Sequence, residues 1–329
     1  MFEAVLTICA LAGAPCRAAL LPGHEAPTRA ACATALPAGA RCVPAGPALA
    51  LTEIAPGVLV HRGAVAEPGA GNAGDVANLG VVIGARSVAV IDTGGSAPVG
   101  EALWRAIRAR TDLPISHVIL THMHPDHVLG ASVFDGARIV GHAGLARALA
   151  ERGAGYLESL QRLIGPGPML GTALPRIDEG VGDAARIDLG GRQLALRAWP
   201  LAHSATDLTV LDEATGTLFA GDLLFDDHVP ALDGSLPGWQ AALDALGALN
   251  AQRVVPGHGG PVLDWPGGGA AQARYLDTLA RETRAAIAAG ERLTQATGHV
   301  AASEAPLWSL FDAYNPRNVT AAFSELEWE

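Results

Sequence analysis

Four potential metal ligands stand close together in one short run of the chain, Thr121-His122-Met123-His124-Pro125-Asp126-His127. The run follows residues 115–120, whose β-branched content predicts a buried strand. His122 and His124 alternate in an extended segment, so their rings can point to the same side and bind one ion. Asp126 and His127, beyond a proline bend, would face a second ion. Because histidine acts mostly as a switch or a ligand, this run requires a fold that builds a metal site at a strand end.

Three further candidate ligands lie later in the chain, each shortly after a predicted strand: His203, Asp222 and His258. A catalytic zinc ion has three protein ligands and one open position, so the first cluster needs ligands from elsewhere. In α/β folds, ligand chemistry sits on loops beyond the strand ends. We therefore expect these three side chains to join the cluster.

Strand-like and helix-like segments alternate from about Leu51 onward, and this alternation predicts the fold class. The predicted strands include residues 58–60, 79–83, 87–92, 194–199, 208–211, 218–220 and 253–255. The predicted helices are residues 99–110, 239–249, 271–293 and 318–326. Such alternation, with hairpins early in the chain, predicts an α/β layered fold with helices on the sheet faces.

The chain divides into three predicted parts, residues 1–47, 51–266 and 267–329. The first part is rich in Ala and Pro and holds all the cysteines, Cys9, Cys16, Cys32 and Cys42. Four clustered cysteines predict two disulfides with three possible pairings, although four buried thiols fit the composition equally well. A zinc knuckle is disfavoured because no C-x-x-C pair is present. The second part carries the candidate ligands, and the third is expected to be a helical extension.

The charge and the apolar runs of the chain limit its partners. With 22 basic and 33 acidic residues the formal net charge is −11, which argues against nucleic acid as a partner. Every basic residue is Arg, which excludes lysine Schiff-base chemistry and the G-x-x-x-x-G-K-[ST] phosphate loop. No run of roughly eighteen apolar residues exists, so no integral membrane segment is expected. Residues 2–14 imitate part of a signal peptide but carry Glu3 and no positive charge, which leaves a periplasmic and a cytoplasmic location open.

The H-x-H-x-D-H run, followed by a later His, a Gly-Asp and a Gly-His-Gly, resembles the metallo-β-lactamase fold superfamily over residues 51–266. The resemblance implies a four-layer αβ/βα sandwich with a zinc site at one edge. It implies one metal held by His122, His124 and His203, a second held by Asp126, His127 and His258, and a bridging Asp222.

The bridging carboxylate narrows the activity that the resemblance implies. Asp222 is typical of the glyoxalase II, lactonase and phosphodiesterase branches, whereas the antibiotic-degrading members lack that Asp. We therefore expect a hydrolase with two zinc ions, or iron or manganese in their place, that acts on an ester, thioester or lactone of a small molecule. A metal-bridging hydroxide would attack, with Asp126 as the catalytic residue that orients it. A phosphodiester is less favoured because the acidic chain offers no basic stripe.

Residues 75–80, 233–235, 318–320 and 325–329 resemble a narrower subgroup, the zinc metallohydrolases of the quinoprotein relay system, which are relatives of the SoxH-like proteins. Members of this subgroup are encoded beside quinoprotein dehydrogenases. The resemblance therefore implies a functional link to such a dehydrogenase, and it favours a periplasmic setting.

Two other classes of function stay open. One is a mononuclear iron dioxygenase of sulfur compounds, as in the persulfide dioxygenase branch of the superfamily. That branch uses two His and one Asp, so the fuller ligand set speaks against it. The other is a non-catalytic accessory protein that holds metal for a dehydrogenase system, and the intact ligand set argues against it as well.

Several residues near the cluster receive less specific predictions. Asp92 is expected to fix a turn near the metal loop rather than to bind metal. His228 is a candidate substrate contact, although an exposed polar loop is the favoured interpretation. Arg105, together with residues 108 and 110, is expected on a solvated helix face. Asn318 begins a glycosylation sequon that nothing else in the sequence supports. The pocket walls are expected from loops at residues 67–74, 156–175 and 226–238.

Overall fold

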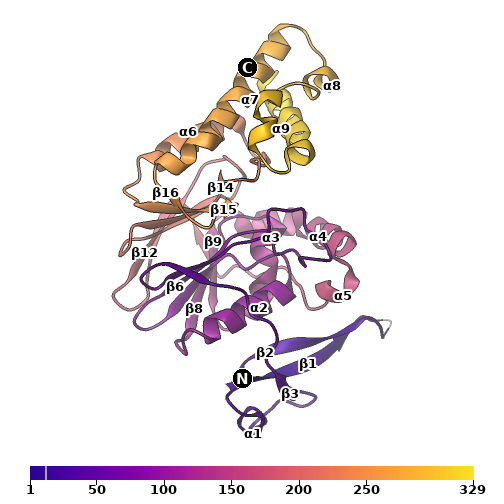
Figure 1. Cartoon of the computed structure of the whole chain (residues 1–329), viewed down its shortest axis with the longest axis vertical. Helices are drawn as coiled ribbons and strands as arrows, with labels where there is room; N and C mark the ends of the chain where they lie inside the picture. The colour runs from indigo at the N-terminus through magenta and orange to yellow at the C-terminus, as the bar shows by residue number, and fades with distance from the viewer. Residues whose placement is uncertain (12) are drawn as a thin grey trace.

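The computed structural model describes residues 1–11 and 13–329. Two β-sheets lie at the centre of the chain (Figure 1). The first has seven strands in the order β10-β9-β8-β7-β6-β5-β4. Its strands are β4 (Thr52–Ala55), β5 (Val58–His61), β6 (Leu79–Ile83), β7 (Val88–Ile91), β8 (Ile115–Ile119), β9 (Arg138–His142) and β10 (Glu179–Val181).

The second sheet has six strands in the order β11-β12-β13-β14-β15-β16. Its strands are β11 (Ala184–Asp188), β12 (Gln193–Ala198), β13 (Leu208–Asp212), β14 (Thr217–Phe225), β15 (Arg253–His258) and β16 (Leu263–Asp264). Apolar side chains of both sheets meet in one buried core, including Val82 and Ile119 from the first and Leu194 and Phe219 from the second. Burying one face of each sheet against the other removes this apolar surface from water.

Helices cover the outer face of each sheet and complete the four layers. On the first sheet lie α2 (Ala97–Arg108), α3 (Pro125–Val128), α4 (Leu145–Ile164) and α5 (Pro166–Met169). On the second lie α6 (Leu236–Gly247), α7 (Ala270–Ala288), α8 (Leu293–Ala296) and α9 (Phe311–Leu326). Figure 1 shows these two groups on opposite sides. The predicted α/β sandwich is thus confirmed. Within residues 1–11 and 13–329, no helix has the length and apolar character needed to cross a bilayer.

Helix α4 corrects the expectation that residues 156–175 form a loop. The helix continues to Ile164 although it contains Gly153 and Gly155, which disfavour helix. Leu149, Leu160 and Ile164 are buried against the first sheet. Their burial, about 1.5–3 kcal/mol for each fully buried side chain, outweighs the cost of the glycines.

Asn318, which is 1% exposed, joins helix α9 to the loop at residues 230–232. Its amide nitrogen donates to the carbonyl oxygen of Pro230 at 2.6 Å and to the hydroxyl of Tyr275 at 2.8 Å. Its amide oxygen accepts from the backbone N–H of Leu232 at 2.9 Å. The side chain of the sequon is therefore buried and fully occupied inside the protein.

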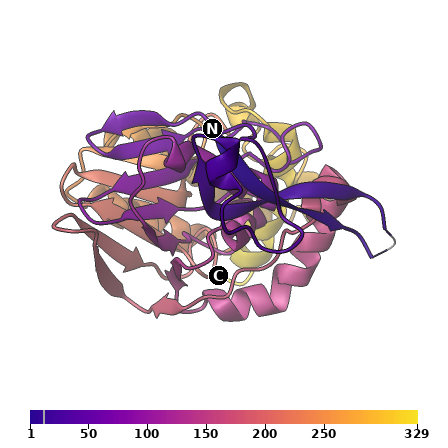
Figure 2. The same ribbon diagram turned by 90° about the horizontal axis from the view of Figure 1, so that it is seen from below.

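The N-terminal segment forms a small three-stranded sheet below the sandwich, in the order β2-β1-β3 (Figure 1). It consists of β1 (Phe2–Cys9), β2 (Cys16–Ala26), α1 (Arg29–Cys32) and β3 (Arg41–Pro44). Disulfides join Cys9 to Cys16 and Cys32 to Cys42, which decides between the pairings and free thiols left open by the sequence. Seen from below, the β1–β2 hairpin reaches out beyond the neighbouring elements (Figure 2).

Buried ion pairs hold this small sheet against α2. The carboxylate of Glu3 accepts from Arg105 Nε at 2.7 Å and from Nη2 at 2.9 Å. Arg17 donates to Glu101 at 2.8 Å. Both arginines are largely covered, so the predicted solvated face at Arg105 is wrong. The sequence pattern of α2 could not reveal a partner that lies about a hundred residues away along the chain.

The Glu3–Arg105 pair gives a stability prediction. The substitution Glu3→Gln keeps the shape of the side chain but leaves the Arg105 cation covered and without its main partner. We expect the free energy of unfolding to fall by about 3 kcal/mol, measured by urea denaturation. As a control, Arg138→Gln breaks the exposed pair with Glu179 and should cost less than about 1 kcal/mol. Equal losses in the two variants would contradict the role given to Glu3.

Candidate metal centre

The segment after β8 presents its four candidate ligands in two directions. The chain bends at residues 122–123, and Pro125 starts the short helix α3 with His124, whose backbone is extended, as its N-cap residue. Proline suits this first position because its φ is already helical and its missing N–H would be unpaired there. The start of the helix separates His122 and His124 from Asp126 and His127, although the segment before it bends instead of running extended.

Asp92, directly after β7, holds this metal loop in place. Its backbone has a φ of +58°, which a short polar side chain tolerates better than most residues. Its carboxylate accepts from the N–H and the hydroxyl of Thr121, each at 2.8 Å, and from His127 Nδ1 at 2.8 Å. The expectation that Asp92 fixes the turn is confirmed. Because His127 Nδ1 donates to Asp92, its Nε2 faces the cluster.

The second sheet supplies the other three candidate ligands. His203 follows β12, and His258 ends β15. Asp222 lies within β14, which runs three residues further than Asp222, and the β14–β15 register shifts on either side of Gly221. Such bulges bend a strand and redirect a side chain. A Cβ atom on Gly257 would lie 1.9 Å from Asp222 Oδ1, so only glycine leaves room for this carboxylate.

Three histidine nitrogens and one carboxylate oxygen form the first ligand group: His122, His124, His203 and Asp222. His124 Nδ1 lies 3.0 Å from His122 Nε2 and 3.0 Å from His203 Nε2. Asp222 Oδ2 lies 3.7 Å from His122 Nε2 and 3.5 Å from His203 Nε2. Zinc–nitrogen bonds of 2.0–2.1 Å in a tetrahedron place ligand nitrogens about 3.3 Å apart, which is close to the observed spacing.

The second ligand group is formed by Asp126, His127 and His258. Asp126 Oδ2 lies 3.3 Å from His258 Nε2 and 3.5 Å from His127 Nε2. The Asp222 carboxylate also reaches this group, since Oδ1 lies 3.1 Å from His127 Nε2 and Oδ2 lies 3.4 Å from His258 Nε2. The structure therefore brings all seven predicted ligands together, with Asp222 between the two groups.

The hydrogen bonds on the far side of each ring test whether this cluster fits metal ions. His258 Nδ1 donates to the carbonyl of Val76 at 2.9 Å, and His124 Nε2 donates to Asp233 at 3.0 Å. With His127 held by Asp92, three rings thus use one nitrogen for an outer hydrogen bond and turn the other towards the centre, where a metal ion would displace any proton. Within residues 1–11 and 13–329, the buried atoms His127 Nε2 and Asp222 Oδ1 have no hydrogen-bond partner. Converging lone pairs and carboxylates are the donor set that divalent zinc binds.

The electrostatics of the cluster divide its histidines into two kinds. Burial lowers the pKa of His203 to about 3 and that of His122 well below its usual value. Burial also opposes the charge on His258, but the carboxylates of Asp222 and Asp126 outweigh it and raise the pKa to about 9. The same carboxylates raise the pKa of His127 well above its usual value. Without metal, two histidines of the second group therefore hold protons at neutral pH.

These protons give a prediction about metal binding. Zinc needs neutral imidazole, so it must displace the protons on His127 and His258. Near pH 7 we expect the metal-free protein to release about two protons as the centre fills. The release should fall, and the zinc affinity should rise, as the pH approaches 9. Calorimetric titrations in buffers with different ionisation enthalpies measure this number. A release close to zero at pH 7 would contradict the assigned ligands.

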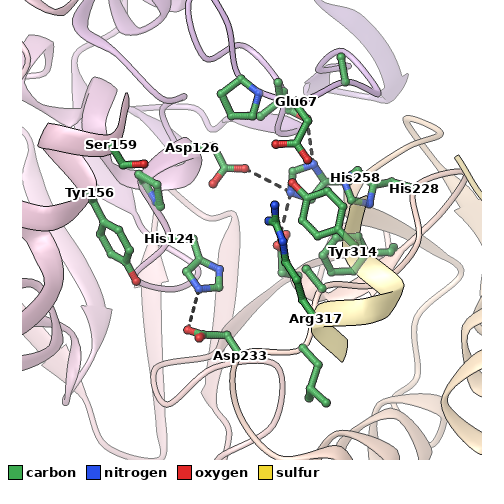
Figure 3. Close-up of a pocket in the computed structure, with 18 of the residues that line it drawn as sticks. Glu67, His124, Asp126, Tyr156, Ser159, His228, Asp233, His258, Tyr314 and Arg317 are labelled. Atoms are coloured by element: carbon green, nitrogen blue, oxygen red, sulfur yellow. Dashed lines mark hydrogen bonds and ion pairs between the residues drawn. The ribbon is translucent and has the colours of Figure 1, made fainter. Parts of the chain in front are cut away.

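A pocket of about 330 Å³ opens over the cluster (Figure 3). Its walls come from the loop at residues 66–68, α4, the loop at residues 228–233 and α9. The metal-facing floor includes His124, Asp126, Asp222 and His258. Of the three loops expected to form the walls, the first and third do so, whereas the second is the helix α4.

His228 lines this pocket and is 4% exposed, so the favoured interpretation of an exposed polar loop is wrong. Its Nδ1 donates to the carbonyl of Val229 at 2.5 Å. Its ring lies between those of His258 and Tyr314, with centroids 5.2 and 4.7 Å away. Burial lowers its pKa to about 4, so the ring is neutral at physiological pH.

Asp233 lies in the third predicted pocket wall, but the sequence did not indicate its contacts. Its carboxylate accepts from His124 Nε2 at 3.0 Å and from Arg152 Nη2 at 3.2 Å. A carboxylate behind a ligating histidine orients the ring and raises its basicity. Tyr156 begins the second predicted pocket wall, but its contact with Arg152 in α4 was not predicted. Asp233 stood in a run that carried a resemblance, but only the fold shows its contact with His124.

Comparisons with known proteins agree with this geometry. The sequence model described as the metallo-beta-lactamase superfamily matches residues 73–258, and no curated protein matches. Among solved structures, the sec-alkylsulfatase Pisa1 from Pseudomonas sp. has a TM-score of 0.62 at 16% identity, covering 84% of this chain and 50% of its own. A metallo-beta-lactamase from Pontibacter korlensis has a TM-score of 0.55 at 23% identity, covering 70% and 99%. TMB-1 has a TM-score of 0.55 at 21% identity, covering 70% and 98%.

At these identities the structural likenesses show the fold alone. The chain spans about half the length of the alkylsulfatase, whereas the two shorter proteins match nearly end to end. The family match covers more than half of the chain and includes all seven ligand positions, the last of which, His258, is also its final residue. This protein therefore belongs to the metallo-beta-lactamase superfamily.

Proposed function

We propose that this protein is a hydrolase that holds two zinc ions and cleaves an ester, thioester or lactone. The observation that carries the proposal is the position of Asp222. Its two carboxylate oxygens face both ligand groups, at 3.1 to 3.7 Å from four histidine nitrogens. One carboxylate shared in this way suits two cations side by side better than one cation alone.

The ligand residues would prepare the reaction as follows. Two bound zinc ions would lower the pKa of a water molecule and polarise the carbonyl oxygen of the substrate. Asp126 turns Oδ2 towards His127 and His258, which leaves Oδ1 to accept a hydrogen bond from the attacking water. Phe225 and Leu232 line the pocket beside the cluster and limit the access of bulk water. His228 would contact the substrate from the neighbouring wall.

We also propose that the chain belongs to the quinoprotein relay subgroup and works with a quinoprotein dehydrogenase. Three of the runs that carry this resemblance contribute lining residues of the pocket, Val76, Asp233 and Asn318. Asp75 accepts from His61 Nε2 at 2.8 Å, and Glu325 accepts from the hydroxyl of Ser235 at 2.6 Å. Asp233 and Asn318 hold the pocket loop, as described above. A dehydrogenase gene beside this one, and loss of dehydrogenase-dependent growth on deletion, would support the link.

We also propose that the three parts of the chain are separate structural units. The family match at residues 73–258 falls inside the proposed hydrolase domain, residues 51–266. Residues 1–47 would be a disulfide-bonded module and residues 267–329 a helical extension. Since Tyr314 and Arg317 of α9 line the pocket, the extension would contribute to substrate binding.

Metal content and activity together test the proposed function. Elemental analysis of the purified protein should give about two zinc ions per chain, and this form should hydrolyse members of a panel of esters, thioesters and lactones. One iron ion per chain, together with oxygen consumption on persulfide substrates, would indicate a dioxygenase instead of a hydrolase. Metal binding without turnover of any panel member would instead favour a metal-holding accessory protein.

A further inference from the structure

One face of α9 forms the pocket wall that lies beyond the family match. Tyr314, Arg317 and Asn318 all line the pocket, at the i, i+3 and i+4 spacing of a single helix face. Asn318 is locked by its buried hydrogen bonds, whereas the Arg317 side chain is exposed. Its guanidinium carbon lies 5.1 Å from the centre of the Tyr314 ring. Figure 3 shows Arg317 projecting from α9 towards the space above Asp126 and His258.

Arg317 differs from the other arginine of the pocket in its charge balance. Arg152 forms two hydrogen bonds with the Asp233 carboxylate, so its charge is already compensated. Arg317 has no carboxylate within ion-pair distance among residues 1–11 and 13–329. It is therefore a cation without a direct ion pair among these residues, and it lies over an aromatic ring and is directed into the pocket. Stacked guanidinium groups are well suited to bind carboxylates and related anions.

The C-terminal part of α4 and the loop at residues 66–68 contribute apolar side chains to the pocket wall. Leu163 lines the pocket and is 49% exposed, although it is a large apolar side chain. Ala66 and Pro68 line the pocket as well, and Glu67 between them lines it with its carboxylate beside Tyr314. Because it lines the pocket, Leu163 offers an apolar surface to a bound ligand. The pocket thus offers a cationic wall, an apolar wall and a metal-binding floor.

Resting on the hydrolase function proposed above, we propose that the substrate carries an anionic group, a carboxylate or its equivalent, which Arg317 binds away from the scissile bond. The carbonyl to be attacked would lie over the cluster, and an apolar portion would lie against Leu163. Tyr314 would keep the guanidinium over the pocket, so it acts as a positioning residue. This assigns the substrate class: an amphipathic ester, thioester or lactone with a negative charge.

Paired probes that differ only in charge test this proposal. The zinc-loaded full chain is assayed with 3-acetoxybenzoate, an anion, and with its neutral methyl ester. In Arg317→Gln, kcat/KM for the anion should fall about 10- to 100-fold, mainly through KM, while that for the methyl ester changes less than about twofold. The control Arg281→Gln removes the same charge from the exposed Arg281–Glu282 pair on α7 and should leave both probes unchanged. Equal losses for both probes in Arg317→Gln would overturn the proposal.

A binding measurement keeps this test independent of turnover. Calorimetry measures the binding affinities of benzenesulfonate and of the neutral methyl phenyl sulfone. Both compounds are poor zinc ligands. Arg317→Gln should weaken the binding of benzenesulfonate about 10-fold or more and leave the binding of the sulfone unaffected. If no ester is hydrolysed but this difference appears, the hydrolase function fails and the anion site stands. If esters are hydrolysed but benzenesulfonate binds wild type and variant alike, the anion site is overturned. If Arg317→Gln impaired the turnover of alkyl sulfates and of no other probe, Arg317 would bind the anion at the scissile bond. This result would also overturn the proposal.

Discussion

The substitution Asp222→Asn is expected to lower hydrolysis by at least about 10³-fold and to lower the zinc content from about two ions per chain to about one. The amide keeps the shape of the side chain, so the neighbouring glycines still accommodate it. It loses the negative charge that faces four histidine nitrogens, and an amide nitrogen then faces one of the ligand groups. The expected loss in rate corresponds to several kcal/mol of transition-state stabilisation, because each factor of ten in rate equals about 1.4 kcal/mol.

Asp233→Asn is the matched control for this variant. It also removes a carboxylate from the pocket, but one that acts on the metal only through His124. Substitution of a residue that supports a metal ligand usually lowers metal affinity or activity 10- to 100-fold. The hydrolysis rate of Asp233→Asn should therefore lie between those of the wild type and Asp222→Asn. Asp222→Asn protein with about two zinc ions and near-normal rates would show that no carboxylate bridge is needed.

Asp126→Ala and His124→Ala are each expected to abolish measurable hydrolysis. His124 completes the first ligand group, and Asp126 both completes the second and positions the attacking water. Loss of either therefore removes a ligand and disturbs the shared carboxylate next to it. Turnover is measured with the best substrate of the panel, and metal content is measured on the same samples.

Two variants of matched chemistry separate these losses from general damage. Asp277→Ala changes an exposed aspartate on α7, and His299→Ala changes an exposed histidine that pairs with Glu291. Both should retain wild-type rates and zinc content. Near-normal turnover in Asp126→Ala or His124→Ala, with normal folding by circular dichroism, would rule out the proposed mechanism.

The parts of the centre that could be predicted from the sequence are those whose chemistry is local. His122, His124, Asp126 and His127 stand in one short run, so their spacing alone indicates a metal loop. Asp92 could be assigned to the turn because it ends a strand just before a Thr-Gly-Gly break. The α/β layers follow in the same way from periodicity along single segments.

The residues that could not be predicted depend on contacts between distant segments. Asp233 reaches His124 across 109 positions of sequence, and Arg105 reaches Glu3 across 102. Arg317 and Tyr314 stand in an ordinary helical pattern, and only the packing of α9 on the loop below it turns them towards the pocket. Periodicity records which face of a helix is buried, but not what that face meets.

The division of the ligands between the two sheets has a consequence for the lifetime of the chain. Four ligands follow β8 in the first sheet, and three belong to the second, so each zinc ion would cross-link the two halves of the sandwich. A ligand that binds only the folded form raises the unfolding free energy by about 1.4 kcal/mol for every tenfold excess over its dissociation constant. Chelation should therefore lower the melting temperature and expose the chain to proteases. Zinc supply would then govern how much of this protein a cell retains, as well as how fast that protein works.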